Sequence, residues 1–215
     1  MTDRWSKLAP LTGVLFGLLV VAAVVAGAET PDANSGPAKV IAFYGTHRSE
    51  VETSAILFAL AFLVLVLFGG ALRSYLRRTP GAEGLSSLVL AGAVLMTVGA
   101  LTGTGIEYGL AHHLHQLGPQ AAQTLNFLSQ ELFLPVLAGA FVFAISSGLA
   151  ILRGAALPKW LGWVAIVLGI AVLIPPAGFP ALIGFMLWSI VVGILMYQRT
   201  GAPADMGAAV SQPTS

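Results

Sequence analysis

Six long apolar stretches constrain the fold of this chain more than any other feature of its sequence. They lie at about 8–28, 53–72, 85–106, 132–152, 158–175 and 181–197 of the 215 residues. A helix needs about 20 apolar residues to cross roughly 30 Å of hydrocarbon, and the stretches meet or approach that length. Charged residues make up only 9% of the chain, whereas a soluble domain has about 25%. The sequence therefore predicts an all-α fold, a polytopic transmembrane helical bundle with six spans in one domain over residues 1–199.

The basic residues predict how this bundle is oriented. Eight of the ten lie at ends of spans that would share one side of the membrane: Arg4, Lys7, Arg73, Arg77, Arg78, Arg153, Lys159 and Arg199. Lys39 and Arg48 fall on the other side. Because cytoplasmic connections carry an excess of Lys and Arg, we expect both termini to be cytoplasmic. Segments 29–52 and 107–131 would then lie outside.

The ends of the chain add one alternative and one expectation. The basic start, the apolar run and the Ala-Gly-Ala at 26–28 fit a retained first span. They also fit a cleavable signal peptide, which would leave five spans in the same orientation. The last segment, 200–215, is rich in Ala, Gly, Pro and Ser. Such a composition predicts a disordered cytoplasmic tail.

Spans five and six are short and are joined by Pro-Pro-Ala-Gly-Phe-Pro at 175–180. This composition predicts a tight turn and an antiparallel helical hairpin. Whether both arms cross the bilayer fully, or form a re-entrant hairpin, stays open at their length.

The first outer segment predicts a short amphipathic helix. It would begin near Pro37 and carry Val40, Ile41 and Tyr44 on one face, resting on the membrane or on the bundle. Ser49 and Glu52 have the spacing of a capping box at the entrance to span two.

The second outer segment predicts a helical hairpin that stands above the membrane. Span three would continue to about residue 117, and Gly118-Pro119 would be the break before span four. Folding the chain there brings Glu107 to the height of Glu131. Pro135 should kink the second arm, because it lacks an N–H group for the Glu131 carbonyl oxygen.

These two glutamates are the principal candidates for a functional site, together with Tyr108, His112 and His115 on one helical face. In one interpretation they line a polar pocket, where two facing carboxylates would share a proton or a cation. In the other they cap and solvate helix ends at the outer interface. His112, His115 and Glu131 are weak candidates for a metal site, since imidazole and carboxylate bind Zn, Fe or Mn.

Several functions lack their usual residues. The chain has no cysteine, which excludes disulfides and cysteine-ligated clusters. It has no G-x-S-x-G, H-E-x-x-H or phosphate-binding glycine loop. Its net charge of +1 offers no field for nucleic acid. Charges are missing from the middle of the spans, which argues against a proton relay or ion pathway.

Small residues four apart predict close helix contacts. The pairs are Gly13 with Gly17, Gly99 with Gly103, and Ala144 with Gly148. Packing within one bundle is the main interpretation, and a dimer face is the alternative, so the oligomeric state stays open.

Residues 37–73 and the run Leu-Pro-Lys-Trp-Leu-Gly-Trp at 157–163 resemble a family of six-span bacterial membrane proteins, frequent in actinobacteria and described only as a domain of unknown function. The resemblance covers most of 8–198 and implies a compact bundle in the bacterial inner (plasma) membrane. It implies no catalytic residue.

Three functional hypotheses follow. The first is a non-enzymatic bundle that binds a lipid, another apolar ligand or a membrane protein partner at the outer ends of spans three and four, without a cofactor. The second is a metal-assisted membrane hydrolase that uses the glutamates and histidines. The third is a small transporter subunit. The missing motifs and charges favour the first.

Overall fold

The computed structural model describes residues 7–78, 81–154 and 157–200, and within these ranges every regular element is a helix. Arg4 and the predicted tail after Thr200 lie outside the described residues. The elements are η1 (Ala9–Leu11), α2 (Thr12–Ala26), α3 (Pro37–Thr46), α4 (Arg48–Leu76), α5 (Glu83–His113), η2 (Leu114–Gln116), α6 (Pro119–Glu131), α7 (Phe133–Arg153), α8 (Lys159–Ala171) and α9 (Pro175–Thr200). The predicted all-α fold is confirmed for this part of the chain.

Five segments of the described chain are long and apolar enough to cross a membrane: Ala9–Ala26, Arg48–Leu76, Glu83–Gln116, Pro119–Arg153 and Pro175–Arg199. The fifth predicted span, at 158–175, forms a shorter helix than the others. Its helix, α8, has 13 residues, or about 20 Å of helix, against roughly 30 Å of hydrocarbon. The structure therefore supports five long spans and one short apolar helix.

The turn between the last two spans does not lie where the prolines suggested. The chain reverses at 172–174, and α9 begins at Pro175 and stays helical through Pro180. The predicted turn at 175–180 is therefore wrong. The first four residues of a helix have no intrahelical partner for their N–H groups, so Pro175 and Pro176 fit there without loss. Pro180 is the sixth residue of α9, and there the helix lacks one hydrogen bond. Consequently the last span begins six residues earlier than the predicted 181.

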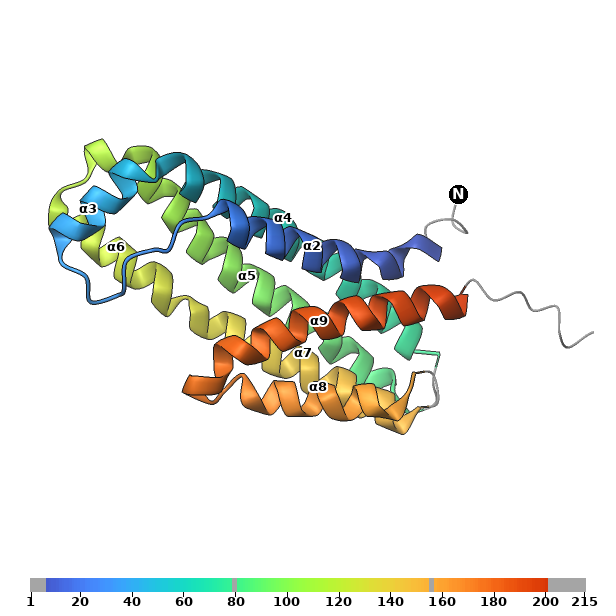
Figure 1. Ribbon diagram of the computed structural model, residues 1–215. Helices are drawn as coiled ribbons and strands as arrows, with labels where there is room; N and C mark the ends of the chain where they lie inside the picture. The colour runs from blue at the N-terminus through green and yellow to red at the C-terminus, as the bar shows by residue number, and fades with distance from the viewer. Residues whose placement is uncertain (1–6, 79–80, 155–156, 201–215) are drawn as a thin grey trace, which may run out of the picture.

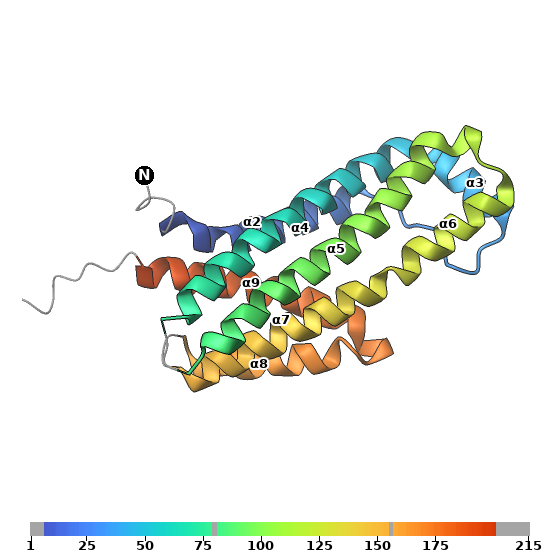
Figure 2. The ribbon, with the colours of Figure 1, turned by 180° about the vertical axis from the view of Figure 1, so that it is seen from behind.

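Consecutive helices pack side by side from α4 to α5 to α7 to α8, and α2 lies against both α4 and α9 (Figures 1 and 2). Glycines allow these contacts. A Cβ added to Gly13 would lie 2.6 Å from the Ser189 carbonyl oxygen of α9, and one added to Gly148 would lie 2.7 Å from the Gly162 carbonyl oxygen of α8. The prediction that these small residues pack within the bundle is confirmed.

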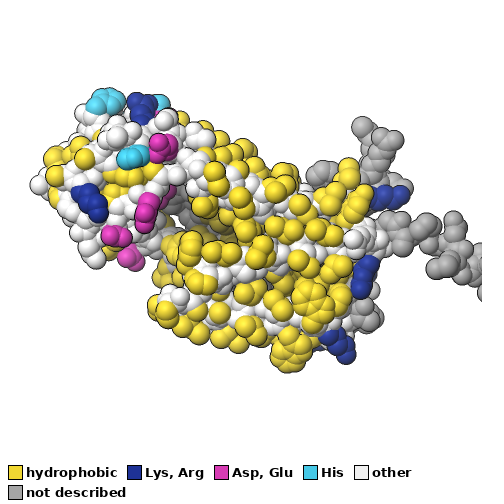
Figure 3. All heavy atoms as spheres, viewed as in Figure 1, with side chains coloured by type: hydrophobic (Ala, Val, Ile, Leu, Met, Phe, Trp, Pro, Cys, Tyr) yellow, Lys and Arg dark blue, Asp and Glu magenta, His cyan; other side chains and the backbone are white. Residues whose placement is uncertain are grey.

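The two ends of the bundle differ in composition. The start of α2, the end of α9 and the α4–α5 and α7–α8 connections lie at one end, which we call the basic end (Figure 1). The opposite end carries α3, η2 and α6. On the face shown in Figure 3, histidines and acidic side chains gather there. The helix order thus separates the described basic residues into the two groups that the sequence predicted.

The second end forms a small cap, which comprises residues 27–52 and 107–131. Its own apolar cluster consists of Val40, Tyr44, Val51, Leu110, Ala111 and Ala122, apart from the main core of the bundle. The predicted amphipathic helix is confirmed as α3, and it rests on the α5–α6 hairpin. That hairpin breaks at Gly118-Pro119 as expected. Its second arm is interrupted at Leu132, one turn before Pro135.

Candidate functional site

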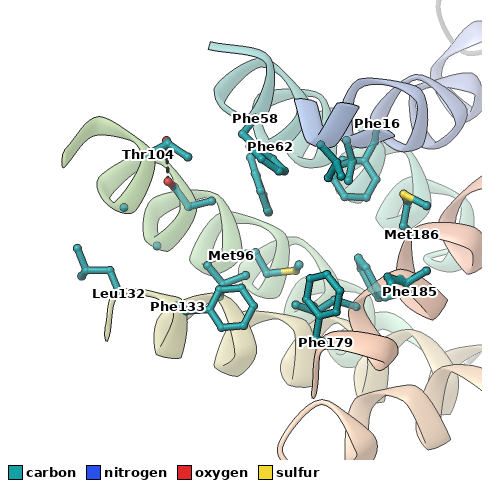
Figure 4. A pocket seen from close by; sticks show the side chains of 18 of the residues that line it. Phe16, Phe58, Phe62, Met96, Thr104, Leu132, Phe133, Phe179, Phe185 and Met186 are labelled. Atoms are coloured by element: carbon teal, nitrogen blue, oxygen red, sulfur yellow. Dashed lines mark hydrogen bonds between the residues drawn. The ribbon is translucent and has the colours of Figure 1, made fainter. Parts of the chain in front are cut away.

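A cavity of about 320 Å³ lies among α2, α4, α5, α7 and α9, next to the cap (Figure 4). The rings of Phe62, Phe133 and Phe179 point into it from three different helices. Its volume is at the low end of the range typical of ligand pockets, roughly 300–1,000 Å³. The lining is almost entirely apolar: Phe16, Val20, Val24, Phe58, Phe62, Met96, Gly99, Ala100, Gly103, Thr104, Glu107, Ser129, Leu132, Phe133, Val136, Phe179, Leu182, Ile183, Phe185 and Met186.

The cavity exists because α5 has small side chains on this side and α9, on the opposite side, does not pack closely against it. Gly99, Ala100 and Gly103 form the wall on α5. On the opposite side, α9 packs mainly on α2 and α8. The space therefore stays open between α5 and α9.

The cavity opens sideways, toward the surface that lipid would cover. Val24 and Phe179 line it and are still 62% and 68% exposed. Figure 3 shows the surface hollowed between the cap and the α8–α9 hairpin. A molecule dissolved in a bilayer could thus reach the cavity without crossing the cap.

Glu107 is the one acidic residue of the described lining. It lies on α5 at the cap end of the cavity, and its side chain is partly buried. Within the described residues, the ion pairs of the structure involve Glu52 and not Glu107. Burial, followed by the negative charge of Glu107, raises the pKa of the Tyr44 hydroxyl well above its usual value. Tyr44 therefore stays neutral and can act as a hydrogen-bond donor.

The other polar side chains of the lining are two hydroxyls that already donate hydrogen bonds. Thr104 donates to the Ala100 carbonyl oxygen at 2.8 Å, and Ser129 donates to the Asn126 carbonyl oxygen at 2.9 Å. A hydroxyl has a single hydrogen to donate but two acceptor lone pairs. Toward the cavity both groups can therefore act only as acceptors.

A buried hydrogen-bond network holds the cap together. Asn126 of α6 is fully buried; its amide donates to the Pro31 and Asp32 carbonyl oxygens, and its side-chain oxygen accepts from the Tyr44 hydroxyl at 3.2 Å. Gln130 donates to the Pro31 carbonyl oxygen at 2.7 Å. The sequence offered Asn126 and Gln130 only as polar groups on one arm, because the loop that they bind lies about 95 residues away along the chain.

The predicted capping box is not formed. The α4 helix begins at Arg48, before Ser49, and its start has no side-chain capping bond. Glu52 instead accepts a hydrogen bond from the Arg48 Nε at 2.8 Å and lies 3.0 Å from the His112 Nδ1. His112 also stacks on Tyr108, with 5.6 Å between ring centroids. Glu52 is thus part of a polar cluster that joins α4 to α5, a role that the sequence did not indicate.

The structure does not bring the predicted site residues together. Glu107 lines the cavity, whereas Glu131 is exposed. His112 binds Glu52, and His115 in η2 lies 3.3 Å from the Gln116 amide. Within residues 7–78, 81–154 and 157–200, no three His, Asp or Glu side chains are grouped as a metal site would require.

No motif of the sequence indicates the cavity, because its space depends on where α9 lies relative to α5. The small residues at 99, 100 and 103 were a partial signal, but small residues pack helices more often than they line pockets. No protein-family model, curated protein or solved structure matches the chain.

Proposed function

We propose that this protein is a non-enzymatic, membrane-embedded binding protein that holds a lipid or another apolar ligand in the cavity between α5 and α9. The observation that carries the proposal is the apolar lining, which is reached from the lipid-facing surface and ends at one carboxylate. The two hydroxyls of the lining are engaged with the main chain. This arrangement favours holding a ligand over reacting with it.

We further propose that the protein lies in the bacterial plasma membrane with six crossings and both termini in the cytoplasm. The grouping of basic residues at one end supports this orientation, since such residues are retained on the cytoplasmic side. The close packing of Gly13 and Gly17 on α9 supports a retained first helix. The α8 helix would be the fifth crossing and the shortest.

Cysteine labelling tests this topology, because the chain has no cysteine and each introduced thiol is unique. In intact cells, a membrane-impermeant maleimide is expected to label Lys39→Cys in the cap and Leu173→Cys at the α8–α9 turn. Ser74→Cys at the basic end should react only after the membrane is permeabilised. Protection of Leu173→Cys alone would show that α8 does not cross, and labelling of Ser74→Cys in intact cells would reverse the orientation.

Filling the cavity tests the proposed function. Val20 lines the cavity and is partly buried, whereas its neighbour Val21 is 47% exposed and outside the lining. Val20→Trp is expected to occupy the space and weaken the binding of dodecanol at least tenfold, a loss of about 1.4 kcal/mol. Native mass spectrometry of the full chain, released from detergent micelles, would measure the bound fraction.

Val21→Trp is the matched control, since it adds the same side chain on the lipid-facing side of the same helix. It should bind dodecanol as the unaltered protein does. Equal binding of dodecanol by both variants would contradict a ligand site in this cavity.

A further inference from the structure

When Glu107 is ionised, the polar side chains at the cap end of the cavity present acceptors only, and we infer from this that the ligand is an amphiphile with an amine head group. The inference rests on the proposed function and adds the chemistry of the head group. It depends on what Glu107, Thr104 and Ser129 offer to a molecule in the cavity, and on which groups the lining does not contain.

The three side chains share one property. Glu107 has carboxylate oxygens, which accept hydrogen bonds when ionised. The hydroxyl hydrogens of Thr104 and Ser129 are used by carbonyl oxygens of their own helices. Among the described lining residues there is no Lys, Arg, His, Asn, Gln, Trp or Tyr, and therefore no other side-chain donor. A head group that only accepts, such as a phosphate or a carboxylate, would meet no complementary side chain.

The charge of Glu107 selects an amine over a neutral donor. A buried carboxylate is costly unless it is paired and hydrogen-bonded. Arg48, a basic residue of the cap, is bonded to Glu52. An alkylammonium has three donors and no acceptor. It therefore matches a lining that only accepts hydrogen bonds and carries a negative charge, whereas an alcohol is neutral and can donate only once.

The shape of the cavity agrees with a chain attached to such a head group. Along α5 the lining runs from Met96 to Glu107, which is roughly 16 Å at 1.5 Å per residue. The polar side chains lie toward the Glu107 end, and Phe16, Phe185 and Met96 line the remainder. An alkyl chain would extend from Glu107 toward the middle of the bundle.

The test compares three probes with the same chain on the full-length protein: dodecylamine, dodecanol and dodecanoate. Native mass spectrometry at a series of probe concentrations gives the affinity of each. Dodecylamine should bind about tenfold to a hundredfold more tightly than dodecanol, the range expected for charge-assisted hydrogen bonds. Dodecanoate should bind most weakly. This comparison requires no substitution, so it does not depend on a variant that folds.

Two variants then assign the preference to one carboxylate. Glu107→Gln should bind dodecylamine and dodecanol with similar affinity. Glu131→Gln, which removes a charge from the same end of the bundle but at an exposed position, should keep the preference of the unaltered protein.

Each of the other possible results would overturn one specific claim. Equal binding of amine and alcohol by the unaltered protein would overturn the amine head group and leave the apolar ligand site intact. A preference that survives in Glu107→Gln, or that is lost equally in Glu131→Gln, would overturn the role of Glu107. Failure of all three probes to bind would overturn both the inference and the proposed function.

Discussion

Replacing Gly92 with valine is expected to separate α5 from α7 and to destabilise the whole bundle. A Cβ at this position would lie 2.5 Å from the Phe143 backbone nitrogen and 2.9 Å from the Gly139 carbonyl oxygen. Backbone atoms cannot move aside as a flexible side chain can. Overpacking a core lowers the free energy of unfolding by about 1–3 kcal/mol. Because this clash is with backbone atoms, we expect a loss at or above the upper limit. Thermal unfolding in detergent, with the yield of monodisperse protein, would measure the loss.

Gly105→Val is the control for this prediction. Gly105 lies on the same helix, but a Cβ there would have no atom within 4 Å other than its chain neighbours and the adjacent backbone of α5. Both substitutions carry the same cost of a β-branched residue in a helix. The difference between the two variants therefore reports the helix contact alone. If they unfold at the same temperature, the close approach of α5 and α7 at Gly92 is not present in the folded protein.

Asn126→Ala is expected to loosen the cap, with a loss of about 2–3 kcal/mol in the stability of that region. The substitution removes the acceptor of the buried Tyr44 hydroxyl and a donor to the Pro31 and Asp32 carbonyl oxygens. A buried polar group that loses its partner still bears the cost of leaving water. Hydrogen exchange should become faster in α3 and the adjoining loop, while the apolar parts of α4 and α5 keep their protection.

Thr124→Ala provides the comparison, since Thr124 is exposed on the same helix and bonds only to the Gln120 carbonyl oxygen one turn earlier. Its exchange pattern should match that of the unaltered protein. Unchanged exchange in Asn126→Ala would mean that the cap is held by its apolar cluster and not by this network.

The features of the fold that local sequence determines were predictable. Apolar length predicted the long helices, and Gly118-Pro119 predicted the break between η2 and α6. Proline at the start of α3 and the spacing of Val40 and Tyr44 predicted the cap helix and its buried face. These signals act within a few residues, and the surroundings did not override them.

Features that depend on how distant segments meet were not predictable in the same way. The prolines at 175–180 suggested a turn, yet their position after the reversal at 172–174 made them the first residues of α9. Glu107 and Glu131 looked alike in sequence, but one lines a cavity formed with α9 and the other faces outward. The spacing of Glu52 predicted a capping box with Ser49. In the structure its side chain instead contacts Arg48, one turn earlier, and His112 of α5.

Pro180, inside α9, makes the start of this helix more flexible than the opposite wall of the cavity. Pro180 cannot donate to the Pro176 carbonyl oxygen, so the beginning of α9, which carries Phe179, is joined to the remainder of the helix by fewer hydrogen bonds. The opposite wall belongs to α5, which packs closely on α7 at Gly92 and Gly139. It cannot bend unless these two helices separate. A ligand should therefore enter from the side by displacing the first residues of α9, while α5 and α7 stay in place.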